Sequence, residues 1–256
     1  MLKEFAAMLL FVAAAATAAH THDFSYHAPG KLQRSPTGKA SGTGDPANRK
    51  IYAASIRLPI ELANDENLYL NSQVYRPGGQ HGGSGGQCHT GNYSMPWADT
   101  FCEVRSRSTL LCPAANGGHQ GVDIRKPKCS GDYFAVAVED GTIISTNRYT
   151  SSVLLKGNSG TTYIYLHLEP DTISVTPNQR VKVGEKFGKI SNFMNGGRDT
   201  TLHLHFEMKQ TVSYMGQPIF THVPPYSTLV HANRERLGLP NMNNAGALAI
   251  DNAREK

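Results

Sequence analysis

The sequence LHLHFEM at residues 202–208 alternates apolar and polar side chains. Successive side chains of a β-strand point to opposite faces, so the four apolar residues would form one core-facing layer. His203, His205 and Glu207 would then project together from the other face. Two imidazoles on one face of a rigid strand can hold a metal ion or move protons. Each could instead be an ordinary surface histidine, but a pair that alternates with a core face favours a functional role.

A second stretch, GHQGVDI at residues 118–124, places His119 and Asp123 four residues apart. Either a helical turn or an extended strand can bring these two side chains to one side of the chain. Gly121 lies between them and permits a close backbone approach that a side chain would obstruct. His119 and Asp123 are therefore a second set of candidate functional residues.

The stretch YIYLHL at residues 163–168 is another alternating strand. We expect its aliphatic residues to face the core, with Tyr163, Tyr165 and His167 on the opposite face. If this strand neighbours the one at 202–208, His167 points to the face that carries His203 and His205.

Short alternating runs separated by turn residues predict the elements that must position these side chains. The predicted strands are Phe134–Val138, Thr142–Thr146, Val153–Lys156, Thr162–Leu168, Arg180–Val183, Phe187–Ile190 and Leu202–Lys209. We therefore predict a mainly β fold, with a compact antiparallel β-sheet domain and a mostly irregular N-terminal extension.

The hydrophobic fraction of 39% counts Tyr and omits Gly. Counted with Gly instead of Tyr it is about 45%, close to an ordinary globular composition, which excludes collagen, coiled coil and wholesale disorder. The 25 Gly and 14 Pro favour turns and short strands over long helices. The net charge is +5, which suits an anionic partner such as a cell wall. No stripe rich in Lys and Arg accompanies it, so we expect no nucleic-acid partner.

The first residues, MLKEFAAMLLFVAAAATAA, have the pattern of a secretory signal peptide. Lys3 precedes an apolar run from Phe5 to Ala16, and cleavage is predicted near Ala18. The alternative is a retained membrane anchor, but the run is short for a bilayer span. We expect a periplasmic or secreted protein without stable membrane insertion after cleavage.

All four cysteines lie between residues 88 and 129, and their even number in an exported chain predicts disulfides. The absence of a Cys-x-x-Cys pair argues against a zinc cluster. Three pairings are possible. We favour Cys88–Cys102 with Cys112–Cys129, because these loops are small and easy to close.

The predicted organisation has five segments. Residues 1–18 are the signal peptide, 19–50 a flexible linker and 51–112 an N-terminal accessory region that shapes or covers the site. Residues 113–225 form the main domain and 226–256 a C-terminal tail. Within the accessory region, 51–76 is predicted to hold two short extended segments, and the Gly-rich stretch 77–86 a plain loop rather than a phosphate cradle.

The ordered motifs His-x-Gly-x-Asp, Tyr-x-His-Leu and His-Leu-His-Phe-Glu resemble the lysostaphin/LytM-type zinc metallopeptidases, a family of peptidoglycan endopeptidases. The resemblance covers roughly residues 117–225, including a turn and strand at 181–190. It implies that the main domain is a catalytic domain of the family's duplicated hybrid motif type. One departure is the run Asn195–Leu202, where the family more often has Ser/Thr-Gly-Pro, and this leaves the detailed specificity open.

Carried over by motif, the resemblance implies that His119, Asp123 and His205 hold one zinc ion per chain. His167 and His203 would be the catalytic imidazoles that move protons, and which does which stays open. The expected function is that of an exported zinc endopeptidase acting on peptide bonds in peptidoglycan stems or cross-links. The alternatives are a secreted peptidase of Gly-rich proteins and a non-catalytic regulator of cell-wall amidases.

Overall fold

The computed structural model describes residues 24–30, 49–105, 107, 109–112, 118–129 and 131–240. The predicted signal peptide, most of the predicted linker and the last part of the predicted C-terminal tail lie outside these residues. The predictions for those segments remain predictions.

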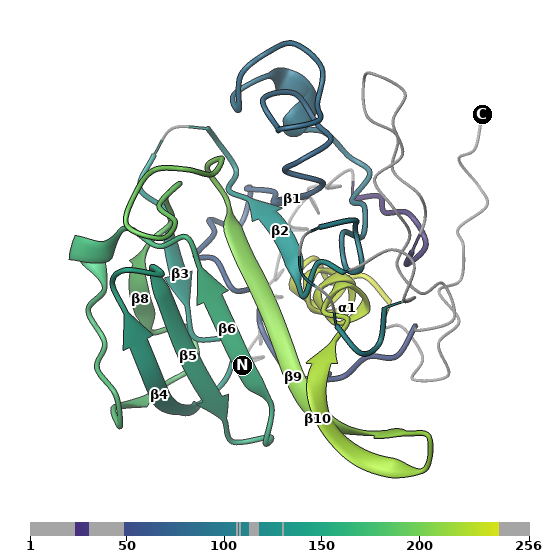
Figure 1. Ribbon diagram of the computed structural model, residues 1–256, viewed down its shortest axis with the longest axis vertical. Coiled ribbons are helices and arrows are strands. Elements are labelled where there is room, and N and C mark those ends of the chain that lie inside the picture. The colour runs from purple at the N-terminus through teal and green to yellow at the C-terminus, as the bar shows by residue number, and fades with distance from the viewer. Residues whose placement is uncertain are drawn as a thin grey trace, which may run out of the picture.

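An antiparallel sheet of eight strands dominates the described chain (Figure 1). Its order is β1-β2-β9-β6-β5-β4-β7, with β10 paired to β9, while β3 and β8 form a separate two-stranded sheet. The strands are β1 (Tyr69–Leu70), β2 (Val122–Arg125), β3 (Phe134–Val136), β4 (Gly141–Asn147), β5 (Ser152–Gly157), β6 (Thr162–Leu166), β7 (Arg180–Val181), β8 (Lys186–Lys189), β9 (Leu204–Tyr214) and β10 (Gln217–Val223). The helices are the short 3-10 turns η1 (Thr90–Asn92) and η3 (Pro170–Thr172), and α1 (Tyr226–Arg236). The predicted mainly β, antiparallel fold is confirmed.

Each of the seven predicted strands overlaps a strand of the structure, but α1 was not predicted. The eight residues from Tyr226 to Asn233 at the start of this helix are all buried. A helix covered on nearly all sides lacks the polar face that marks a surface helix in a sequence. The signal that would have revealed α1 is therefore weak.

The core lies on one face of β9 and β6. Leu204, Phe206 and Met208 of β9 are fully buried there, as their alternation predicted. The face prediction for β6 itself is wrong: Tyr163 and Tyr165 point into this core, whereas Ile164 and Leu166 line the opposite face. Beyond the strand, Leu168 is buried in the core and His167 faces the other side, as predicted.

The reversed face of β6 has a physical reason in the two phenol groups. The Tyr163 hydroxyl donates to Glu139 Oε1 at 2.7 Å, and the Tyr165 hydroxyl accepts from the Val138 N–H at 3.2 Å. Both rings are therefore buried without an unpaired polar atom. His167 follows the strand with a φ of 65°, which breaks the alternation and turns its side chain away from the tyrosine face.

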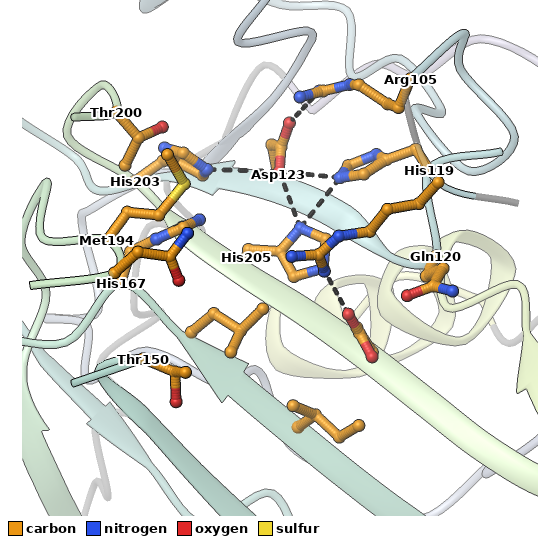
Figure 2. A pocket seen from close by; sticks show the side chains of 15 residues that line it. Arg105, His119, Gln120, Asp123, Thr150, His167, Met194, Thr200, His203 and His205 are labelled. Atoms are coloured by element: carbon orange, nitrogen blue, oxygen red, sulfur yellow. Dashed lines mark hydrogen bonds and ion pairs between the residues drawn. The ribbon is translucent and has the colours of Figure 1, made fainter. Parts of the chain in front are cut away.

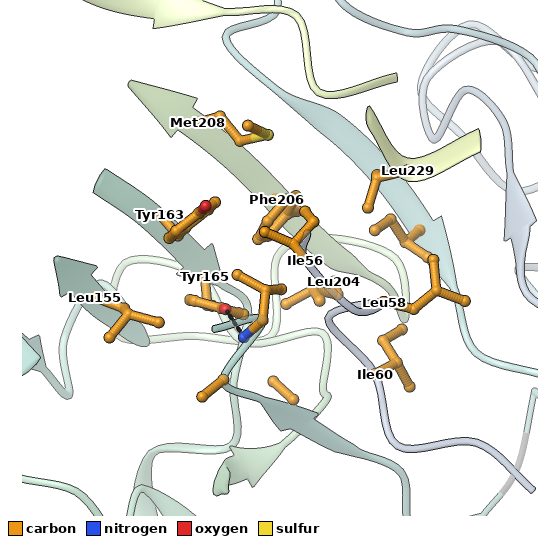
Figure 3. Packing of buried hydrophobic residues seen from close by; sticks show 14 of the residues in the cluster. Ile56, Leu58, Ile60, Leu155, Tyr163, Tyr165, Leu204, Phe206, Met208 and Leu229 are labelled. Atoms are coloured by element: carbon orange, nitrogen blue, oxygen red, sulfur yellow. Dashed lines mark hydrogen bonds between the residues drawn. The ribbon is translucent and has the colours of Figure 1, made fainter. Parts of the chain in front are cut away.

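The N-terminal extension shares the same core. Figure 3 shows Ile56, Leu58 and Ile60 packed among side chains of β9, and Leu229 of α1 belongs to the same cluster. The backbone of Tyr52 also donates to the Thr228 hydroxyl of α1 at 3.0 Å. Within the described part of 51–112, regular structure is limited to β1 and η1, so the predicted mostly irregular character is confirmed.

The disulfides are Cys88–Cys129 and Cys102–Cys112, so the favoured sequential pairing is wrong. Loop size could not decide the pairing, because closing a 41-residue loop rather than a 17-residue loop costs less than about 1 kcal/mol. Tertiary contacts decide it instead. Arg125, at the end of β2, donates to the Gln87 carbonyl at 3.1 Å, and the Cys102 N–H donates to the His119 carbonyl at 2.9 Å.

Candidate functional site

A cleft with a volume of about 550 Å³ lies on the face of β6 and β9 that points away from the core. All five residues singled out from the sequence line it: His119, Asp123, His167, His203 and His205. Figure 2 shows His119, Asp123 and His205 pointing toward one another, with His167 and His203 grouped beside Thr200 and Met194. The exposed His81 and His89 of the accessory region do not line this cleft.

Strand register brings the three candidate metal ligands together. Asp123 of β2 stands directly opposite His205 of β9, and His119 lies on the segment that leads into β2. His119 Nε2 is 2.9 Å from His205 Nδ1 and 3.2 Å from Asp123 Oδ1, and His205 Nδ1 is 3.1 Å from the same oxygen. All three residues are buried, with at most 6% of each exposed.

Gly121 permits this close approach of β2 to β9, as the sequence predicted. A Cβ added there would lie 2.3 Å from the Phe206 carbonyl oxygen, a distance that no real side chain occupies. Any larger residue would therefore push apart the two strands that carry Asp123 and His205.

The hydrogen bonds of the two imidazoles leave acceptor atoms facing one another. His119 Nδ1 donates to the Thr100 carbonyl at 2.8 Å, and His205 Nε2 donates to Glu207 Oε1 at 2.8 Å. In the neutral tautomers that these bonds select, His119 Nε2 and His205 Nδ1 both present lone pairs to the Asp123 carboxylate. Three converging acceptors repel unless a cation or a proton lies between them, so the donor set suits a metal ion.

The electrostatics of the three groups support the same conclusion. Burial lowers the pKa of His119 to about 4, which favours its neutral form. Burial also opposes charge on His205, but hydrogen bonds to Asp123 and Glu207 outweigh it and raise the pKa of His205 to about 9. Without a cation, a proton on His205 would therefore relieve the repulsion at the same place.

The separations of the three atoms also fit zinc. Bonds of about 2.0–2.1 Å from zinc to nitrogen and oxygen place neighbouring atoms of a tetrahedral site about 3.3 Å apart. The observed separations are 2.9, 3.1 and 3.2 Å. Three protein ligands of this kind are the number found in catalytic zinc sites, which keep a fourth position for water or substrate.

Arg105 of the accessory region holds the other oxygen of Asp123. Its Nη2 lies 2.7 Å from Asp123 Oδ2 and 2.6 Å from Glu103 Oε2, which leaves Asp123 Oδ1 to face the histidines. Although burial opposes ionisation, His119 and Arg105 hold the pKa of Asp123 well below its usual range. Sequence reasoning missed Arg105 and Thr100, because the irregular segment that carries them has no periodic pattern.

Glu207 orients His205 from the opposite side. Its Oε1 accepts from His205, and its Oε2 lies 2.9 Å from Nε2 of His222 on β10. A carboxylate that receives the second N–H of a metal-binding imidazole fixes its tautomer and raises its basicity. The sequence predicted only that Glu207 shares a strand face with His203 and His205. His222 lies on β10, a strand that was not predicted.

His167 and His203 form a second pair, with ring centroids 4.7 Å apart. His203 Nδ1 donates to the Thr201 carbonyl at 2.8 Å, and His167 Nδ1 donates to the Phe193 carbonyl at 3.0 Å. Burial lowers the pKa of both imidazoles and keeps them neutral. With Nδ1 protonated, each ring keeps an Nε2 lone pair that can accept a proton, and Nε2 of His203 lies 3.3 Å from Asp123 Oδ1.

The segment that carries most of this site matches a family model. Residues 117–219 match the model of Peptidase family M23, which confirms the resemblance to lysostaphin/LytM-type peptidases that the motifs indicated. The match covers less than half of the chain, and the peptidases of the matched family are zinc enzymes.

Solved structures similar to the chain include a candidate glycyl-glycine endopeptidase LytM from Ruminococcus gnavus, with 24% identity over 44% of this chain and 47% of that chain and a TM-score of 0.37. The catalytic domain of lysostaphin from Staphylococcus simulans has 23% identity over 49% of this chain and 90% of that domain, with a TM-score of 0.35. The chain thus spans about half of the first protein. None of the curated proteins compared with the chain matches it.

Proposed function

We propose that the protein is an exported zinc-dependent endopeptidase that hydrolyses peptide bonds in peptidoglycan stems or cross-links. The observation that carries this proposal is the convergence of three buried acceptor atoms, from His119, Asp123 and His205, beside two neutral imidazoles in one cleft. The family match of residues 117–219 supports the reaction class.

In this proposal His119 Nε2, Asp123 Oδ1 and His205 Nδ1 hold the zinc ion. When bound, zinc acts as a Lewis acid and lowers the pKa of a coordinated water to about 7. Arg105 and Glu207 keep the Asp123 carboxylate and the His205 ring in the orientations that the ion requires.

His203 and His167 supply the proton transfers. A neutral imidazole with Nδ1–H bonded to a backbone carbonyl can take a proton at Nε2 and later release it to the leaving amine. His203 is assigned the role of base, and His167 is assigned donation to the leaving group or to the oxyanion. Peptide-bond cleavage needs both events, which explains why a second imidazole stands beside the first.

Export and the choice of substrate rest on separate observations. Two disulfides suit an oxidising compartment and agree with the signal peptide predicted from the sequence. None of the helices in the described part of the chain combines the length and apolar composition of a membrane span. The net charge of +5 favours an anionic polymer such as a cell wall.

The test is release of peptides from purified sacculi, followed by mass spectrometry of the fragments. We expect peptide release that a chelator abolishes and added zinc restores. His205→Ala should be inactive, and His81→Ala is the matched control, because His81 is exposed and outside the cleft. Release that resists the chelator, or equal activity in both variants, would contradict the proposal. A Gly-rich protein digested in parallel separates a wall enzyme from a general peptidase of such proteins.

A further inference from the structure

The loop that leads into β9 is held by two glutamine side chains of the accessory region. The Leu202 N–H donates to Gln87 Oε1 at 2.7 Å, and the Thr201 hydroxyl donates to Gln73 Oε1 at 2.7 Å. These residues are 115 and 128 positions apart in sequence, so the contacts join two remote segments of the chain. The loop they hold is the one that departs from the usual run of the peptidase family before its histidines.

One of these two loop residues, Thr201, also contacts His203. Its Nδ1–H donates to the carbonyl of Thr201, the residue whose hydroxyl is bound by Gln73. If the peptide between Thr201 and Leu202 rotated, this carbonyl would leave the imidazole. The ring could then take its other tautomer, with the proton on Nε2 and no lone pair toward the cleft.

Both glutamines are themselves fixed. Gln73 is buried and its amide donates to the carbonyl of Asn71 at 3.1 Å. The Gln87 carbonyl accepts from Arg125 at 3.1 Å, and the next residue, Cys88, is bonded to Cys129. Gln87 is thus anchored to β2, which also carries the ligand Asp123, and to the segment that follows β2.

We propose that Gln73 and Gln87 are positioning residues for His203. Their side-chain oxygens hold the Thr201–Leu202 peptide, and this peptide holds the imidazole in the tautomer that accepts a proton from the cleft. The inference deepens the proposed function and rests on it for the role of His203. It also makes the accessory region a part of the active site, rather than a segment that only covers it.

Gln87 is the better residue to change, because it is half-buried and its side-chain oxygen accepts the hydrogen bond from the Leu202 N–H, which a substitution can remove or keep. Gln87→Leu removes the acceptor, while Gln87→Glu keeps an oxygen for the Leu202 N–H. Gln80→Leu is the matched control, since Gln80 is exposed in the same accessory region. One neutral hydrogen bond shifts a conformational equilibrium by about threefold to tenfold, and misplacing a catalytic group costs up to about a hundredfold.

The experiment measures kcat and KM on a cross-linked muropeptide, together with bound zinc, for the zinc-loaded wild type and the three variants. Gln87→Leu should lower kcat by about tenfold, the upper end of that shift, with KM and zinc content unchanged. Gln87→Glu should stay within about threefold of the wild type, as should Gln80→Leu. A Gln87→Leu kcat within twofold of the wild type, or an equal loss in Gln87→Glu, would overturn the inference.

A second readout does not depend on activity. Long-range ¹H–¹⁵N spectra of the imidazoles report which nitrogen of His203 carries the proton. We expect Nδ1–H in the wild type and a mixture of tautomers in Gln87→Leu. Wild-type protein that cleaves no peptide would refute the proposed function alone, and the spectra would still decide the positioning. An unchanged His203 spectrum in Gln87→Leu would refute the positioning.

Discussion

Removing the guanidinium of Arg105 should destabilise the metal-free protein more than the zinc-loaded protein. Arg105 pairs with Asp123 and Glu103, whose side chains are 1% and 2% exposed. Arg105→Ala leaves Asp123 as a buried carboxylate without its guanidinium partner, a change that costs about 3–5 kcal/mol. Glu103 adds little to this cost, because burial raises its pKa to about 7 and a proton can neutralise it.

We take the lower end of that range, about 3 kcal/mol, because the Arg105 side chain is itself 22% exposed. In a domain of this size each kcal/mol shifts the midpoint of thermal unfolding by roughly 2–4 °C, so the expected loss is roughly 6–12 °C. A bound zinc ion would neutralise Asp123 in place of the guanidinium and would stabilise the folded state by mass action. The loss should therefore be smaller in excess zinc.

Thermal unfolding followed by circular dichroism, in chelator and in excess zinc, measures both quantities. The control is Arg148→Ala, since the Arg148–Asp171 pair is 62% and 96% exposed and should contribute little. The reasoning fails if metal-free Arg105→Ala unfolds within about 2 °C of the wild type. It also fails if zinc leaves the difference between the two proteins unchanged.

Three further changes probe the same site. Glu207→Gln should weaken zinc binding about tenfold by removing the charge that orients His205, as measured by competition with a chromogenic chelator. Gly121→Ala should lower both stability and zinc content, because the added methyl group meets the backbone of β9; native-like zinc stoichiometry would argue otherwise. Replacing Cys102 and Cys112 by serine should cost about 2.7 kcal/mol in urea unfolding for a 10-residue loop, and an unchanged midpoint would count against this.

The residues that could be predicted from the sequence lie where one side of a strand is apolar and the other polar. The alternation around His203 and His205 gave both the core face and the cleft face of β9, and Gly121 indicated the close approach of β2. The prediction of which face of β6 points to the core failed because tyrosine and aliphatic side chains can both be buried. Only the hydrogen bonds of its phenol groups, which are tertiary, decide the face.

The supporting residues could not be predicted for a different reason. The segment with little regular structure before β2 carries Arg105, Thr100 and the two glutamines. Without a regular backbone, the spacing of residues in the sequence does not indicate where their side chains point. The prediction of the disulfide pairing failed for a similar reason. The alternative pairings differ in the free energy of loop closure by less than one tertiary contact contributes.

The packing of the accessory region has a consequence for how the molecule assembles. Ile60 forms a β-bridge with Ala135 and belongs to the hydrophobic cluster that contains Phe206. The core residues of the accessory region are therefore buried only by strands that lie much later in the sequence. Contacts between such distant positions slow folding, because a long loop must close before any contact is gained. The residues up to β9 must therefore be present before this cluster can close around Ile60. Until then Trp97, which belongs to the same cluster, lacks the partners that bury it in the folded protein.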